Sequence, residues 1–172
     1  ECWELALNKA NGPSLLALSR EGLPQVRTED AGENLSAKGA YRLRAARAER
    51  RVVLIATGSE VEIALATADA LEADGIGADV VSMPCWSRFD AQPRSYQDEV
   101  LPDVQPSEIL RVSIEAGVTM GWERYTMARG LRFGVDTWGA SAPAKDLYQH
   151  FGLTAQAIAP KVTAALRELQ GR

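Results

Sequence analysis

Short apolar runs and longer segments of helical periodicity alternate along most of the chain. Residues 52–57 form a continuous apolar, β-branched run, which is typical of a strand covered on both faces. Apolar residues then recur at three- and four-residue spacing as far as Leu71, which predicts a helix that Gly75 ends. Residues 78–83 form the next apolar run. This order predicts a βαβ unit with a right-handed crossover and two parallel strands.

The same alternation continues to the end of the chain. Further expected elements are helices at 95–101, 121–128, 143–150 and 154–169 and strands at 109–115 and 131–135. Ser59, followed three residues later by Glu62, predicts a capping box at the start of the first long helix. Thr154 is placed to cap the last helix. These elements predict a three-layer α/β domain with a mostly parallel sheet.

The first forty residues follow a different pattern. Residues 1–11 predict a helix that Gly12 and Pro13 end, although the segment has no recognisable N-cap. Residues 14–19 form an apolar run that predicts a buried strand. Residues 20–36 are polar and lack periodicity, which indicates a linker and a domain boundary, and residues 40–43 predict an edge strand. The N-terminal helix is interpreted as cut by truncation, with a frayed native terminus as the alternative.

Composition narrows the class of protein. The chain has 172 residues, a formal net charge of −4 and 46% apolar residues, as expected of an ordinary globular domain. The negative charge argues against a nucleic-acid partner, and no apolar run is long enough for a membrane span. Two cysteines, Cys2 and Cys85, make neither a disulfide framework nor a zinc site, so a reduced cytoplasmic setting is expected.

Few residues are candidates for chemistry. His150, the single histidine, is expected at the end of a helix in a structural role, and Cys85 is expected to be inert. Gly58 and Ser59 lie where a strand meets a helix, a place that favours ligands, but the lack of a glycine fingerprint favours an ordinary turn. Glu115 ends a strand, where a buried carboxylate could orient a partner loop or the chain across an interface, or could equally cap the following turn.

Arg20 directly follows the predicted strand at 14–19. An arginine in that position can present its planar fork to a phosphate or a carboxylate. A solvated surface arginine is an equal interpretation from position alone. No self-sufficient active site is visible in the sequence.

Several segments in order resemble the C-terminal part of transketolase. They are Asn11-Gly12-Pro13, Leu18-Ser19-Arg20, Leu23-Pro24, Ala56-Thr57-Gly58-Ser59-Glu60-Val61, Val80-Val81-Ser82-Met83-Pro84, Phe89-Asp90, Val100-Leu101-Pro102, Ser113-Ile114-Glu115-Ala116-Gly117, Gly139-Ala140-Ser141-Ala142-Pro143-Ala144 and His150-Phe151-Gly152-Leu153-Thr154. No single motif decides the match, but the ordered combination is specific. It runs from about residue 11 to about residue 154.

The resemblance implies a fold, a division of the chain and one site residue. Residues 1–36 would be the end of the pyrimidine-binding domain with its linker, and residues 37–172 a C-terminal α/β domain with a mixed five-stranded sheet. In the family, the arginine of the Leu-Ser-Arg segment binds the sugar phosphate, and here that residue is Arg20. The family usually has glutamine at the next position, where this chain has Glu21.

The resemblance also implies what the whole enzyme does. It would be a cytoplasmic homodimer that moves a two-carbon ketol unit from a ketose phosphate to an aldose phosphate, in the pentose phosphate pathway or the Calvin cycle. Thiamine diphosphate and Mg²⁺ (or Ca²⁺) would be bound by residues that precede Glu1, so this chain alone is expected to bind neither and to be inactive. The alternatives are a stand-alone assembly or regulatory module, or a related thiamine-dependent enzyme such as dihydroxyacetone synthase.

Overall fold

The computed structural model describes residues 1–28, 32–102 and 109–170. The strands are β1 (Tyr41–Arg44), β2 (Arg50–Ala56), β3 (Gly77–Ser82), β4 (Leu110–Ile114) and β5 (Leu131–Phe133). The helices are α1 (Cys2–Leu7), the 3-10 turn η1 (Leu35–Lys38), α2 (Glu60–Ala73), α3 (Trp86–Asp90), α4 (Arg94–Val100), α5 (Glu123–Thr126), α6 (Ala144–His150) and α7 (Ala155–Gln170).

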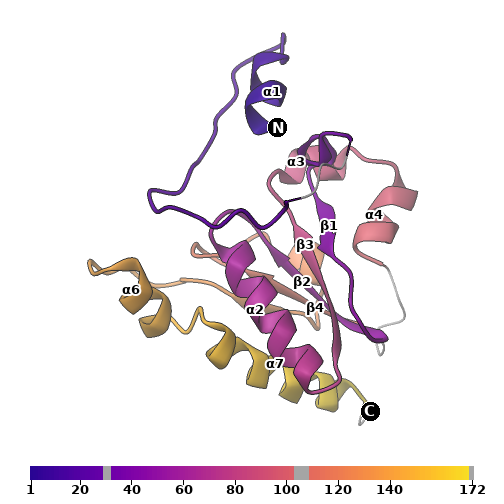
Figure 1. Ribbon diagram of the computed structural model, residues 1–172, viewed down its shortest axis with the longest axis vertical. Coiled ribbons are helices and arrows are strands. Elements are labelled where there is room, and N and C mark those ends of the chain that lie inside the picture. Colours follow the sequence, from indigo (N-terminus) through magenta and orange to yellow (C-terminus); the bar gives the residue numbers. More distant parts are fainter. Residues whose placement is uncertain (29–31, 103–108, 171–172) are drawn as a thin grey trace.

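The five strands form one sheet in the order β1-β3-β2-β4-β5. Figure 1 labels the strands β1 to β4 of this sheet. β2 pairs in parallel with β3 and with β4, and β4 pairs in parallel with β5. β1 is an antiparallel edge strand on β3. The sheet is therefore mixed but mostly parallel, as the sequence and its family resemblance predict.

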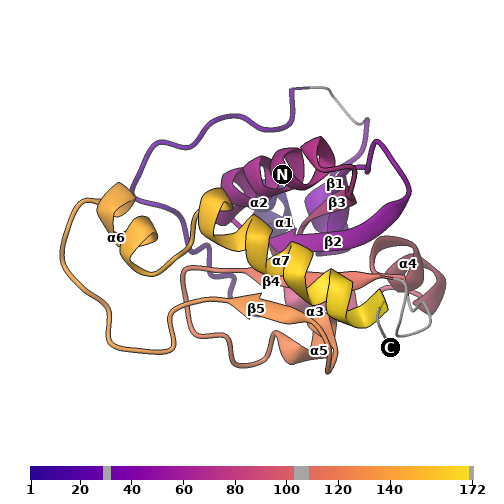
Figure 2. The ribbon, with the colours of Figure 1, turned by 90° about the horizontal axis from the view of Figure 1, so that it is seen from below.

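Helices cover both faces of the sheet (Figure 2). α2 and α7 pack together on one face, over a core that includes Leu54, Val112 and Ile158. The other face carries α3, α4 and α5, and its core includes Ile55, Phe89 and Trp122. Alternate residues of β2 enter the two cores, which explains why its sequence is apolar without interruption. The predicted three-layer α/β architecture is confirmed.

The N-terminal predictions are partly wrong. Residues 14–19 do not form a strand but an extended segment, in which the side chain of Leu15 is 93% exposed and that of Leu18 71% exposed. A buried strand needs neighbouring strands, and none of the five described strands lies beside this segment. Helix α1 ends at Leu7, four residues before the predicted stop, although Gly12 does adopt the positive φ expected of it.

The predicted capping box at α2 is also wrong. Ser59 has helical dihedral angles, and its side chain caps no backbone N–H. The turn already begins at Thr57, whose carbonyl accepts a hydrogen bond from the N–H of Glu60. A capping side chain needs an extended N-cap residue, so Ser59 sits too far into the turn. By contrast, Thr154 does cap α7, because its hydroxyl accepts a hydrogen bond from the N–H of Ala157.

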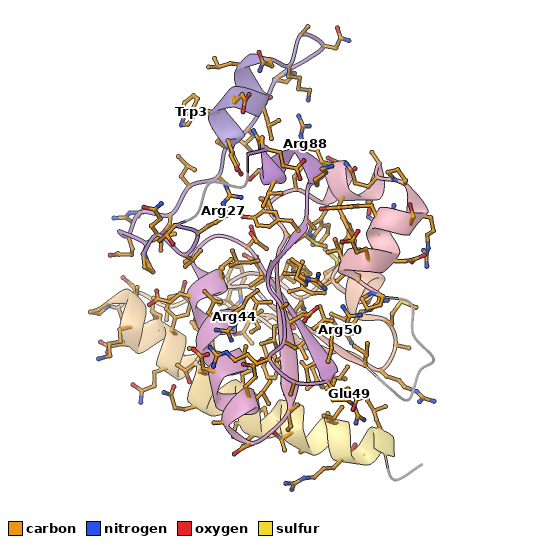
Figure 3. All side chains as sticks on the ribbon, turned by 45° about the vertical axis from the view of Figure 1, so that its right-hand side comes forward. Trp3, Arg27, Arg44, Glu49, Arg50 and Arg88 are labelled. Atoms are coloured by element: carbon orange, nitrogen blue, oxygen red, sulfur yellow. The ribbon has the colours of Figure 1, made fainter. Side chains whose placement is uncertain are left out.

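Gly77 at the start of β3 has no room for a side chain. A Cβ at this position would lie 2.2 Å from the carbonyl oxygen of Glu49, the residue before β2 that Figure 3 labels. Gly77→Ala is therefore expected to lower the free energy of unfolding by about 2 to 4 kcal/mol. Gly139→Ala, where a Cβ meets nothing within 4 Å, is the matched control. Equal denaturation midpoints for the two variants would contradict this packing.

Candidate functional site

The carboxyl ends of β2 and β4 meet at the point where the strand order reverses. The chain leaves β2 through α2 to reach β3 on one side, and β4 then lies on the other side of β2. Ala56 and Ile114 are paired across the two strands, so the segments that follow them emerge side by side. In open α/β sheets such a switch point is the preferred position for ligands.

Glu60 is the centre of a polar cluster at this edge. It lies in the first turn of α2, and only 3% of the residue is exposed. Its Oε1 accepts a hydrogen bond from the hydroxyl of Ser59 at 2.8 Å and another from the hydroxyl of Tyr148 in α6. Burial, and then the hydrogen bond with Glu60, raise the pKa of Tyr148 to about 12. Tyr148 therefore donates its proton throughout the physiological pH range.

Glu115 completes this cluster from the end of β4. Burial raises the pKa of its carboxyl to about 7, with a further contribution from the neighbouring Glu60. Glu115 can therefore gain or lose a proton near neutral pH, which an exposed glutamate does not do.

The cluster does not suit a phosphate or a diphosphate. The N-terminus of α2 would be the natural position for an anion, but its first turn carries Glu60 and Glu62. In the described ranges, no three His, Cys, Asp or Glu side chains are grouped so that they could hold a metal ion. The residues of this edge therefore do not fit thiamine diphosphate and its divalent metal ion.

Arg20 lies in a different part of the structure from the cluster, and unlike Glu60 it is exposed. It belongs to the extended segment that joins α1 to the sheet domain. Within the described residues, its guanidinium has no hydrogen bond or ion pair. Ser19, one residue earlier, accepts a hydrogen bond from the N–H of Glu21 and turns the chain locally. The structure therefore does not bring Arg20 together with Glu60, Glu115 or Tyr148.

Polar contacts of Glu1 attach helix α1 to the domain. The Glu1 carboxylate pairs with Arg27 and accepts hydrogen bonds from the hydroxyl and the N–H of Ser36. Burial opposes ionisation of Glu1, but the hydrogen bonds from Ser36 and Arg27 outweigh it and lower the pKa. Arg27 also lies over the ring of Tyr41 at 5.5 Å. This ion pair and its hydrogen bonds, rather than a shared apolar core, hold the N-terminal segment.

The other candidates from the sequence, His150 and the two cysteines, lie outside the cluster around Glu60. His150 ends α6, is exposed, and has its ring 4.9 Å from that of Phe151. Cys85 precedes α3 as a free thiol, with its sulfur 3.5 Å from the hydroxyl of Ser87. Cys2 and Cys85 line the same crevice of about 370 Å³ between α1 and the domain. None of these positions adds a nucleophile to the cluster.

The sequence does not reveal that Tyr148 belongs to the cluster. Its hydroxyl contacts Glu60 across 88 residues of chain, and no spacing rule links two residues so far apart. The usable signal is that Glu60 follows the end of β2 by four residues and Glu115 directly follows β4, so both carboxylates lie at the carboxyl edge of the same parallel sheet.

The family model described as "Transketolase-like TK C-terminal domain" matches residues 39–154, which is more than half of the chain. The chain belongs to the transketolase family. Its relatives include the transketolase of Sinorhizobium medicae, which is 49% identical over 168 residues. That alignment covers 97% of this chain but only 24% of the relative, so the chain spans about a quarter of the length of such transketolases.

Solved transketolase structures agree with the fold. The Leishmania mexicana transketolase superposes with a TM-score of 0.83 at 35% identity, covering 98% of this chain and 23% of that one. The Pichia stipitis transketolase in complex with sedoheptulose 7-phosphate superposes with a TM-score of 0.86 at 31% identity. This alignment covers 99% of this chain and 24% of the Pichia chain. Both alignments include the N-terminal segment that packs loosely here. The five-stranded mixed sheet is thus that of the transketolase C-terminal region.

Proposed function

We propose that this chain is the C-terminal part of a working transketolase. The whole protein would transfer a two-carbon ketol unit from a ketose phosphate to an aldose phosphate as a homodimer. The observation that carries this proposal is the match of nearly the whole chain to about a quarter of the length of transketolases, together with the family model of the C-terminal domain over residues 39–154. Residues 1–36 would then be the end of the preceding domain and its linker, and residues 37–172 the C-terminal domain.

The chemistry at the reacting carbon would lie outside this chain. In the proposed enzyme, thiamine diphosphate, held by Mg²⁺ or Ca²⁺, supplies the stabilised carbanion. The edge of the sheet described above does not fit that cofactor, because Glu60 and Glu62 occupy the first turn of α2, where its phosphates would bind. The described residues therefore contribute substrate binding and assembly, and the chain alone is expected to be inactive.

Arg20 is the proposed substrate contact. Its guanidinium is exposed and has no internal partner among the described residues, as a phosphate-binding side chain requires before substrate arrives. A planar fork with two parallel N–H groups matches a phosphate, and binding there would position the distant carbonyl of the sugar. The relative solved with sedoheptulose 7-phosphate binds a ligand of this class.

The exposed apolar residues of the N-terminal segment are the proposed assembly surface. Trp3, Leu7, Leu15 and Leu18 are all largely exposed, although such residues are usually buried together. In transketolases the aligned segment is part of a chain about four times as long. We infer that these side chains pack against the preceding domains of the same enzyme. Within the described ranges, no helix is long and apolar enough to cross a membrane.

The experiment for this function is a two-carbon transfer assay on the intact protein, with ketose phosphate donor, aldose phosphate acceptor, thiamine diphosphate and Mg²⁺. Transfer is expected to need both sugars and the cofactor. A non-catalytic module would give no transfer under any of these conditions. A preference for formaldehyde as acceptor would instead favour a dihydroxyacetone synthase.

A further inference from the structure

The two cysteines of the chain, Cys2 and Cys85, line the same crevice of about 370 Å³. Cys2 begins α1, and Cys85 directly precedes α3. Both are free thiols on half-buried residues. Figure 1 shows the start of α1, marked N, facing α3. The fold therefore brings into one crevice two thiols that are far apart in the sequence.

The 3-10 turn η1 positions both cysteines through hydrogen bonds. Near its start, Ser36 donates its hydroxyl and its N–H to the carboxylate of Glu1, the neighbour of Cys2. Just after its end, the carbonyl of Gly39 accepts a hydrogen bond from the N–H of Cys85 at 3.0 Å. A 3-10 helix rises about 2 Å per residue, so Ser36 and Gly39 lie roughly 6 Å apart along its axis. The two cysteines are thus held beside the two ends of one short turn.

The elements that carry the two thiols differ in how firmly they are packed. Phe89 of α3 is 2% exposed and belongs to the core of the sheet domain, so α3 is fixed. None of the residues of α1 is buried, so a shift of α1 uncovers no core. A disulfide needs Cβ atoms about 3.5 to 4.5 Å apart. The crevice can narrow to that distance by movement of α1 toward α3.

The crevice suits a small anionic oxidant. Lys9 and Arg88 line it, and none of its described lining residues is acidic. The carboxylate of Glu1 lies nearby but is paired with Arg27 and bound by Ser36. Glutathione disulfide carries a net negative charge near neutral pH, so the two cations attract it.

We propose that Cys2 and Cys85 form a reversible disulfide when the protein meets a low-molecular-weight disulfide such as glutathione disulfide. The thiolate of one cysteine attacks the oxidant, so that a mixed disulfide forms and one glutathione leaves as its thiolate. The thiolate of the other cysteine then attacks the protein sulfur of the mixed disulfide and releases the second glutathione. Overall, the two protein thiols lose two electrons and two protons, and the oxidant gains them.

The bond would link two parts of the proposed enzyme. The superpositions on the Leishmania and Pichia transketolases cover 98% and 99% of this chain, so α1 takes part in both. If residues 1–36 are the end of the preceding domain, the disulfide ties that domain to the C-terminal domain. Disulfides of proteins in reducing compartments are usually transient and redox-sensing, which fits such a link. Only this interdomain meaning rests on the proposed function, because formation of the bond needs no enzymatic activity.

The test exposes the folded, intact protein to glutathione disulfide, quenches the reaction in acid and digests the protein without reduction. Mass spectrometry is expected to find the peptides of Cys2 and Cys85 linked, with a mass about 2 Da below the sum of the two reduced peptides. Dithiothreitol should restore the separate peptides. Both thiols left free, or both carrying glutathione, would overturn the proposal, whatever the transfer activity of the same sample.

Two single variants distinguish closure of the disulfide from independent reaction of each thiol. In Cys2→Ser and Cys85→Ser the mixed disulfide has no neighbouring thiol to resolve it. The variant that keeps the attacking cysteine should therefore accumulate about tenfold more glutathione adduct on that residue than the wild type does. Equal adduct in the wild type and in both variants contradicts the proposal. Neither cysteine belongs to the described core, so both reduced variants should melt with the reduced wild type.

Discussion

Arg20→Ala in the intact enzyme is expected to raise KM for phosphorylated sugars by about 10- to 100-fold. That range corresponds to the loss of a charge-assisted hydrogen-bonded contact of about 1.5 to 3 kcal/mol. The value of kcat should fall much less, because the phosphate lies far from the reacting carbon. Arg20 is exposed here and contributes no described contact to the fold, so the variant should remain as stable as the wild type. Steady-state kinetics with varied ketose phosphate measures the split.

Two controls make this prediction specific to the phosphate. Arg20→Lys keeps the charge but loses the planar fork, so its KM should lie between those of the wild type and the alanine variant. An unphosphorylated ketose should show the same KM with all three enzymes. Equal KM values for the phosphorylated donor in the wild type and Arg20→Ala would remove Arg20 from the substrate site.

Leu15→Asp is expected to impair the intact enzyme while leaving the isolated fold of the sheet domain unchanged. The side chain of Leu15 is 93% exposed in this chain, so a charge here disturbs none of the described core. If Leu15 packs against the preceding domains, the same charge becomes buried and unpaired, at a cost of several kcal/mol. We therefore expect a lower melting temperature and at least a tenfold loss of activity.

Leu15→Ile is the matched control for that variant. It keeps the apolar surface and changes only its shape, so it should retain most of the activity. Wild-type activity and melting temperature for Leu15→Asp would show that the segment stays exposed in the whole protein. In that case the apolar residues of the N-terminal segment would need another partner.

The sheet domain could be predicted because its signals are local. The apolar run at 52–57, the helical spacing that follows it and the run at 78–83 each specify one element, and their order specifies parallel pairing. The run at 14–19 has the same local signal and yet forms no strand. A strand is stabilised by its neighbours, and apolar composition cannot report whether those neighbours are present.

The candidate functional site could be predicted only in part, because local sequence does not report contacts between elements that are distant along the chain. Glu115 was recognisable as a carboxylate at the end of a strand, but its high pKa depends on burial and on Glu60 from another element. The hydrogen bond between Tyr148 and Glu60 joins two residues that no local pattern relates. The interpretation of Arg20 as a phosphate ligand rests on its place in a family motif, since position alone left a surface arginine equally acceptable.

The most direct measurement is the rate of two-carbon transfer by this 172-residue chain alone, compared with that of the intact protein. Both are assayed with saturating ketose phosphate, aldose phosphate, thiamine diphosphate and Mg²⁺. Saturable transfer by the intact protein and a background rate for the chain alone are the predicted result. A saturable rate from the pure chain, or none from the intact protein, would contradict its role as the substrate-binding and assembling end of a transketolase.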